Sequence, residues 1–137
     1  ESTRNHVENV NSNSYPWDLY WETEFLFAKV NLTCRMFSLA RLYNKKELLQ
    51  KARVMLPECL DHFHHVATQT KSELEKEQNL PYEDERIKKT LGVLLEYQVR
   101  ATEFLLRDKK SDSSFEVWAS NLRSLAEFIH DHAHWWK

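Results

Sequence analysis

Apolar residues recur at helical spacing along most of this chain. The first apolar stretch extends from about Trp17 to Tyr43, and its residues are Trp17, Tyr20, Trp21, Phe25, Leu26, Phe27, Ala28, Val30, Leu32, Met36, Phe37, Leu39 and Leu42. A stripe this wide is broader than one packing face of a helix requires. Two interpretations remain open: the helix is central and buried on more than one side, or it leaves an apolar patch exposed for a partner.

A second periodic stretch follows, with apolar residues at alternating spacings of three and four, on one helix face. These residues are Leu49, Ala52, Leu56, Cys59, Phe63, Val66, Thr70 and Leu74. Asn44 and Glu47 have the spacing of a capping box, which predicts a helix start at Asn44. Pro57 lies inside the stretch, where a proline removes a backbone hydrogen bond. We therefore expect either a kink near Met55 or a second helix that opens at Pro57.

Two further amphipathic helices are predicted after Pro81, which suits the first turn of a helix. The third has a buried stripe made of Ile87, Leu91, Leu94, Gln98, Ala101 and Leu105. The fourth, after a polar connector at 108–113, has one made of Phe115, Trp118, Leu122, Leu125, Ile129, His132 and Trp136. Short connectors favour antiparallel neighbours, so the pattern predicts an all-α, up-down-up-down four-helix bundle, or five helices if the chain breaks at Pro57.

The ends of the chain carry two further expectations. In an up-down-up-down bundle the aromatic residues of the first and last helices meet at one end, and we expect them to form a cluster. These residues are Trp17, Tyr20, Trp21, Trp135 and Trp136. Residues 1–14 are polar and rich in Asn and Ser, which predicts a flexible N-terminal linker ahead of a helical bundle domain at 15–137.

Composition narrows the possible functions. The 137 residues include one glycine and three prolines, and the formal net charge is −2. Glycine is the main supplier of positive φ angles, so its scarcity excludes phosphate-binding loops, dinucleotide-binding turns and the nucleophile elbow. The near-neutral charge gives no strongly basic face for duplex nucleic acid. No apolar run is long enough to span a membrane, so we expect no membrane partner.

The state of the two cysteines indicates whether the protein is intracellular or secreted. Cys34 and Cys59 both lie within apolar helical patterns, which favours two reduced core cysteines in an intracellular protein of the cytoplasm or nucleus. A disulfide between adjacent helices is the alternative, and it would suit a secreted four-helix cytokine. The ends of the chain, Glu1 and Lys137, look like cuts in a longer protein, so we expect a domain of a larger protein.

The histidines invite a metal interpretation. Six of the seven lie on the second and fourth predicted helices: His62, His64, His65, His130, His132 and His134. Asp61 with His64, and Glu127 with His130, have the carboxylate–histidine spacing of di-iron bundles. A helical projection at about 100° per residue, however, turns these side chains away from the apolar stripes. We therefore expect no metal site and no cofactor.

Arg123 and His130 lie on the same polar face of the fourth helix. An arginine and a histidine at this spacing, on a late helix of a small all-α bundle, resemble the HEPN family. In members with nuclease activity the resemblance implies metal-free RNA cleavage at a dimer cleft. His130 would act in acid–base chemistry and Arg123 would contact the phosphate. The alternative interpretation is a solvated face on which Glu127 pairs with both residues.

The favoured function is a non-catalytic scaffold or protein–protein interaction module, since no motif apart from the spacing of Arg123 and His130 points to an enzyme. The partner would be another protein or a peptide segment, and a dimer is compatible with the pattern. The candidate contact residues are Phe27 and Phe37, which could lie beyond the packed stripe, and Gly92. Gly92 projects away from the buried stripe of its helix, which would allow a neighbouring helix or a partner's backbone to approach closely. RNA binding or cleavage by Arg123 and His130 is the alternative function, and a cytokine is the third.

Overall fold

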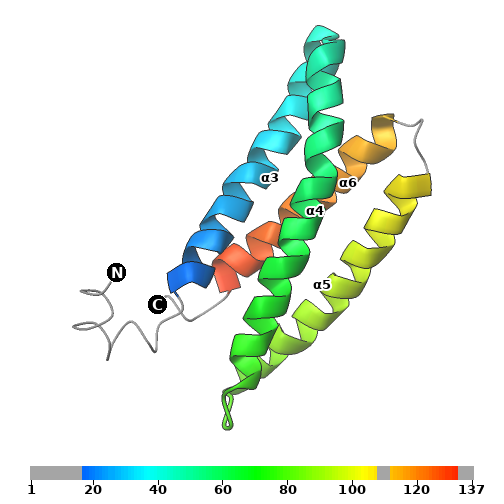
Figure 1. Ribbon diagram of the computed structural model, residues 1–137. Helices are drawn as coiled ribbons and strands as arrows, with labels where there is room; N and C mark the ends of the chain where they lie inside the picture. Colours follow the sequence, from blue (N-terminus) through cyan, green and yellow to red (C-terminus); the bar gives the residue numbers. More distant parts are fainter. Residues whose placement is uncertain (1–16, 108–111, 133–137) are drawn as a thin grey trace.

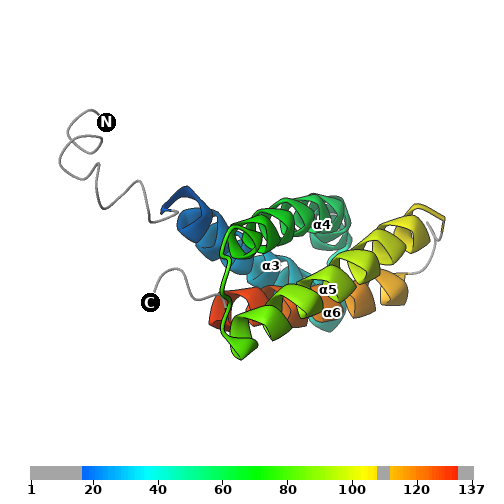
Figure 2. The same cartoon turned by 90° about the horizontal axis from the view of Figure 1, so that it is seen from below.

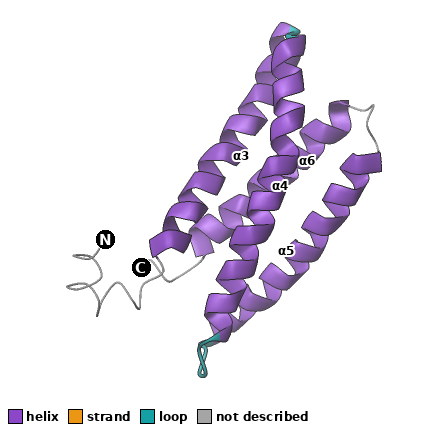
Figure 3. Cartoon of the chain, viewed as in Figure 1, coloured by secondary structure: helices purple, strands orange, loops and turns teal. Residues whose placement is uncertain are grey.

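The computed structural model describes residues 17–107 and 112–132, and these form four α-helices with no β-strand (Figures 1 and 3). The helices are α3 (Trp17–Tyr43), α4 (Lys46–Glu75), α5 (Tyr82–Arg107) and α6 (Asp112–His132). The all-α prediction is confirmed, and the first helix has the predicted limits. The predicted linker at 1–14 and the partners Trp135 and Trp136 of the aromatic cluster lie outside the described residues.

The helices pack around one shared apolar core. α3 packs against α4 and α6, α4 also packs against α5, and α6 contacts both α4 and α5 (Figures 1 and 2). The largest fully buried side chains come from all four helices and include Phe37, Phe63, Leu26, Leu56, Leu60, Leu91, Leu122 and Ile129. The apolar stripes found in the sequence therefore do meet in one core.

The four buried polar residues of this core have hydrogen-bond partners, whereas Nδ1 of the half-buried His62 has none within the described residues. The hydroxyls of Thr23, Thr33 and Thr70 each donate to the backbone carbonyl four residues earlier, at 2.8 Å. Gln98 is buried on α5; its carboxamide oxygen lies 3.0 Å from Nδ1 of His64, and its nitrogen donates to the Thr102 hydroxyl at 3.1 Å. These contacts remove the cost of burying unpaired polar atoms.

The α3–α4 connection corrects one prediction. Asn44 has φ of 54°, the left-handed conformation that asparagine tolerates better than most residues. The Lys45 N–H donates to the carbonyl of Ala40 at 3.0 Å, which is the long-range bond of a Schellman motif. Asn44 therefore ends α3 instead of starting α4. The capping-box prediction was wrong because the N-cap residue is Lys45, which makes no side-chain capping bond.

α4 is one unbroken helix from Lys46 to Glu75, with Pro57 inside it. The predicted division into five helices is therefore wrong for the described residues. The side chain of Pro57 is exposed, whereas Leu56, Cys59 and Leu60 around it are buried. The apolar contacts on both sides of Pro57 hold the helix together across the missing backbone hydrogen bond.

Candidate functional site

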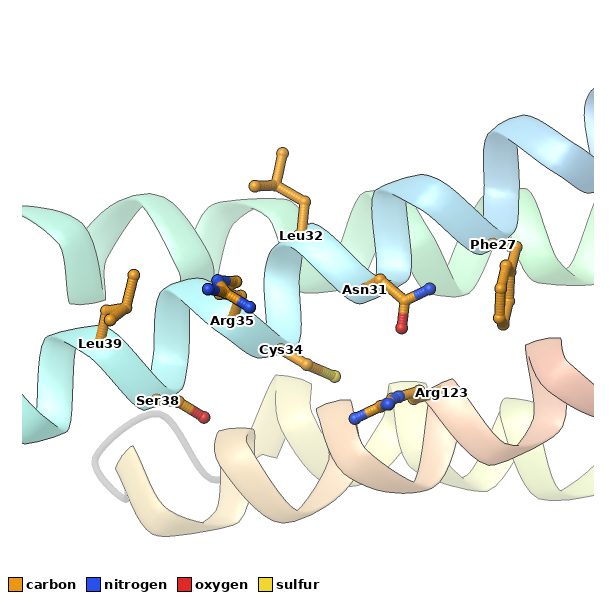
Figure 4. Close-up of a pocket in the computed structure, with 8 residues that line it drawn as sticks. All are labelled: Phe27, Asn31, Leu32, Cys34, Arg35, Ser38, Leu39 and Arg123. Atoms are coloured by element: carbon orange, nitrogen blue, oxygen red, sulfur yellow. The ribbon is translucent and has the colours of Figure 1, made fainter.

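Arg123 lines an open groove between α3 and α6 with a volume of 580 Å³. The α3 side of this groove is made of Phe27, Asn31, Leu32, Cys34, Arg35, Ser38 and Leu39. Figure 4 shows Cys34 and Arg123 pointing into the space between the two helices, while Leu32 points away from it. The groove thus combines two guanidinium groups, those of Arg35 and Arg123, with amide, hydroxyl and apolar groups.

His130 lies two helical turns beyond Arg123, about 10 Å further along α6 at ~1.5 Å per residue. Its Nε2 is 3.0 Å from the Glu24 carboxylate on α3, and its Nδ1 is 3.1 Å from the carboxylate of Asp131. The imidazole also stacks on Phe27, with ring centroids 4.4 Å apart and planes inclined by 19°. The ring therefore joins α6 to α3.

This environment limits what His130 can do chemically. A general acid or base must reach the substrate proton with a ring nitrogen. Both nitrogens of His130 face carboxylates, so a substrate would first have to displace Glu24 or Asp131. The negative charge of these groups also opposes the approach of a phosphate. The spacing of Arg123 and His130 is therefore compatible with a shared face, but the surroundings of His130 are those of a structural contact.

The other histidines contact different neighbours. His62 Nε2 hydrogen-bonds to the Glu22 carboxylate on α3, whereas His64 Nδ1 faces Gln98 on α5. His132 stacks on Phe128 of its own helix. Within residues 17–107 and 112–132, no group of three or more His, Cys, Asp or Glu side chains could hold a metal ion.

Both cysteines are free thiols. Cys34 is half-buried, and its Sγ donates to the carbonyl of Ala119 on α6 at 3.1 Å. Cys59 is fully buried on α4, with its Sγ 3.4 Å from the Thr33 hydroxyl on α3. Burial raises the pKa of Cys34 to about 11 and also raises the pKa of Cys59. Neither thiol is therefore activated as a nucleophile, because activation requires a lowered pKa.

The three candidate contact residues from the sequence, Phe27, Phe37 and Gly92, lie in different environments. Phe37 is 1% exposed and belongs to the core, so its proposed place in an exposed patch is wrong. Phe27 is half-buried, where it stacks on His130 and lines the groove. A Cβ atom added at Gly92 would lie 3.9 Å from Cε of Lys71, an ordinary contact with the end of a flexible side chain. No close backbone approach therefore explains this glycine within the part of the chain that the structure describes.

The outer face of α3 is the exposed apolar patch that the sequence left open as a possibility, but its residues differ from the predicted Phe27 and Phe37. Seven residues at alternating spacings of four and three form it, and we call them the outer seam of α3: Trp21, Phe25, Ala28, Leu32, Arg35, Leu39 and Leu42. Leu39 is half-buried and the other six are exposed. Trp21, Phe25 and Leu42 are 61%, 60% and 68% exposed. Trp17 and Tyr43, also exposed, extend the seam at its two ends.

The inner face of α3 has the same spacing. Its buried residues are Leu19, Thr23, Leu26, Val30, Thr33, Phe37 and Ala40. Each residue of the outer seam follows a buried one by two positions, which is about 200° around the helix. The wide apolar stripe in the sequence therefore consists of two separate seams on opposite faces. The spacing was visible in the sequence, but no local signal says which seam faces inward.

No known protein family matches this chain, and neither the curated proteins nor the solved structures contain a match to it. The function therefore has to be argued from the surface of the molecule itself. No helix in the described part of the chain combines the length and apolar character needed to cross a bilayer.

Proposed function

We propose that this chain is a non-catalytic helical bundle that binds another protein through the outer seam of α3. The observation that carries the proposal is the exposed apolar area of one helix face. The large side chains there are Trp17, Trp21, Phe25, Leu32, Leu42 and Tyr43. At ~200 Å² for each fully exposed side chain, their exposed fractions correspond to on the order of 700 Å².

An area of this size needs a partner. The largest apolar patch of a typical monomer is ~300–600 Å² and is often functional itself. The exposed faces of α4, α5 and α6 are mainly polar or charged, and their large exposed apolar residues are Val54, Tyr82, Val93, Val99, Phe104 and Val117. These are spread over three helices, whereas the α3 residues form one continuous line. α3 is therefore the helix whose outer face resembles a packing surface.

The proposal includes the up-down-up-down arrangement and a location in the cytoplasm or nucleus. The arrangement is supported by the short connections at 44–45 and 76–81, and by the course of the ribbon in Figure 1. The location is supported by the free thiols of Cys34 and Cys59, because reducing compartments keep thiols in this state.

Site-specific photocrosslinking tests the proposal. A benzophenone amino acid at Leu32 should give a discrete crosslinked protein product in the cells that make the chain. The same group at Val93 on α5, which is 63% exposed against 52% for Leu32, should give none. Phe25→Glu should remove the product, because a carboxylate in an apolar contact is costly to desolvate. Equal crosslinking from Leu32 and Val93, or none from either, would contradict the proposal.

A second candidate function is RNA binding in the groove, which the two guanidinium groups of Arg35 and Arg123 favour. Single-stranded RNA mixed with the chain in EDTA tests it. Cleavage that is lost in His130→Ala would support a HEPN-like nuclease, and binding that is lost only in Arg123→Ala would support an RNA-binding groove. Unchanged RNA, neither bound nor cleaved, would remove both.

A further inference from the structure

We propose that the outer seam of α3 binds the same seam of a second copy of this chain. The two helices would run antiparallel, about a two-fold axis that passes at the level of Val30. This inference rests on the proposed function and names its partner. It is carried by the spacing of the seam, by its symmetry about that axis, by the charges along α3 and by the area that pairing would bury.

The spacing of the outer seam is that of a helix-pairing surface. From Trp21 to Leu42 the seam positions, of which Leu39 is half-buried and the others exposed, advance by four and three residues in strict alternation. This is the repeat of the a and d positions in a coiled coil, which packs one helix against another. Six of the seven positions are apolar, and Arg35 is the exception. Scattered surface hydrophobics do not follow such a repeat, whereas a face that packs on another helix does.

Two copies of the seam can pair antiparallel, as any repeat of four and three residues can, and an axis at the level of Val30 also matches the two ends of α3. If two copies of α3 pair antiparallel about that point, Trp21 of one copy faces Leu39 of the other. Phe25 then faces Arg35, and Ala28 faces Leu32. At the ends, Trp17 and Tyr43 face each other. Every seam position except Leu42 thus meets another seam position, and the small Ala28 near the axis lets the backbones approach closely.

Pairing also gives Arg35 a contact partner in the second copy. An exposed arginine interrupts the apolar line of the outer seam at one position. In the antiparallel pair its guanidinium lies against the second copy's Phe25 ring, an arrangement that favours cation–π contact. Within one chain the Phe25 ring already has a cation near it, since Lys29 Nζ lies 5.1 Å from its centroid, and the His62 ring lies 5.7 Å away. That contact also turns Lys29 towards Phe25 and away from the two-fold axis.

The distribution of charge along α3 favours the antiparallel orientation, although three of its charged side chains also pair with residues of α4 or α6 in the same chain. Its acidic residues, Asp18, Glu22 and Glu24, all lie in the N-terminal half. Its basic residues, Lys29, Arg35 and Arg41, lie further along towards the C-terminal end. An antiparallel pair brings the acidic end of one helix to the basic end of the other, whereas a parallel pair would set like charges side by side. Complementary charge fixes orientation and register in this way.

The apolar area of the seam is close to what a stable dimer needs. Each copy would contribute on the order of 700 Å² of apolar side chain. Stable, specific interfaces bury ~800 Å² per partner. The apolar flank made by Met36, Val54 and Met55 adjoins the seam and would add to the contact. A two-fold interface also needs a self-complementary surface, and the symmetry of the seam supplies it.

Analytical ultracentrifugation of the purified chain tests the inference. We expect a mass of two copies at high micromolar concentration, and one copy for Phe25→Glu and for Leu32→Glu. Val93→Glu, on α5, should remain a dimer. Both seam side chains are exposed, so their replacement leaves the core intact, and circular dichroism should show unchanged helix content. A monomeric native chain, or a dimer that survives both seam variants, would overturn the inference.

Thiol crosslinking tests the orientation. Trp21→Cys and Leu39→Cys are prepared as separate variants and oxidised alone and mixed. An antiparallel pair brings position 21 to position 39 of the other copy, so covalent dimers should form mainly in the mixture. A parallel pair would instead give dimers from each variant alone, which would overturn the proposed orientation. The native chain, with Cys34 and Cys59 buried or half-buried, serves as the control.

Failure here can be told apart from failure of the proposed function. If the purified chain is monomeric but photocrosslinking from Leu32 captures a different protein, the interaction module stands and its partner is not a second copy. If neither experiment detects an interaction through the outer seam, both proposals fail.

Discussion

Cys34 shows how packing sets the chemistry of a single side chain. Its thiol donates to the carbonyl of Ala119, and burial disfavours the thiolate strongly enough to raise its pKa from 9.0 to about 11. The folded state therefore prefers the protonated thiol more than the unfolded state does. A group of this kind contributes stability below its unfolded pKa and loses that contribution as the pH rises through its folded pKa.

We accordingly predict that the free energy of unfolding falls as the pH rises from 9 towards 11, and that Cys34→Ala makes the fall less steep. Urea denaturation at several pH values, compared between the two proteins, measures the difference. Other groups titrate in this range, so the difference between the curves is the informative quantity. Identical pH dependence in both proteins would show that burial does not raise the pKa of Cys34.

Gly92 concerns the backbone of a single residue. It lies inside α5 without a positive φ, so its conformational freedom is not used there. An alanine Cβ at this position would lie 3.9 Å from Lys71 Cε. We predict that Gly92→Ala raises the free energy of unfolding by about 0.5–1 kcal/mol, because alanine restricts the unfolded chain more than glycine does.

Urea denaturation of Gly92→Ala beside Val93→Ala measures this gain. The control removes an exposed side chain and should change stability by less than about 0.5 kcal/mol. A loss of stability in Gly92→Ala would mean that something approaches this position more closely in solution.

Helix α4 shows how tertiary contacts override a local signal. Pro57 lowers the helical propensity of its neighbourhood by about 3 kcal/mol, which is enough to divide an isolated helix. Leu56, Cys59 and Leu60 are nevertheless all buried against the other helices, and α4 continues unbroken. Each buried leucine contributes about 1.5–3 kcal/mol of apolar burial, so the two together exceed the cost of the proline.

We predict that Pro57→Ala stabilises the protein by about 1–3 kcal/mol, since the new N–H can donate to the carbonyl of residue 53. The side chain at 57 is exposed, so the replacement removes little packing. Thermal unfolding followed by circular dichroism gives the change, with Glu58→Ala as the neighbouring exposed control. A destabilised Pro57→Ala would indicate that the proline shapes a bend on which the packing of α4 depends.

At the scale of the whole molecule, the two faces of α3 have different environments despite similar residues. Phe37 is in the core at 1% exposure, whereas Phe25 is 60% exposed on the outer seam. The other helices decide this difference, because α4 and α6 pack against the inner seam and leave the outer one uncovered. Replacing Phe37 and Phe25 in turn therefore tests whether only the inner face of α3 is packed within the chain.

Phe37→Ala is predicted to cost about 3–5 kcal/mol, since it removes a buried ring and leaves a cavity. Phe25→Ala should cost less than about 1 kcal/mol in dilute solution, where the proposed dimer is dissociated. Chemical denaturation of both variants at low concentration gives the two values. Equal losses would mean that the outer seam is packed within the single chain.

Much of the fold follows from local pattern. The periodicity of apolar residues predicts the limits of the first helix, the all-α class and most core residues. It can be read from the sequence because it depends only on residues that are close together along the chain. The capping-box prediction at Asn44 was wrong because asparagine is favoured both before the first turn of a helix and in the left-handed position that ends one. The sequence does not say which of the two positions Asn44 occupies. The predicted break at Pro57 failed because the burial of its neighbours outweighs the local penalty.

The candidate site follows from local pattern only in part. Arg123 and His130 share a face, as their spacing requires, but the contacts of His130 with Glu24 and Phe27 come from another helix. The two seams of α3 show the same limit. Both repeat with one period along one helix, so the sequence establishes that both exist. Which one enters the core depends on where α4 and α6 pack, and that is decided by the sum of distant contacts.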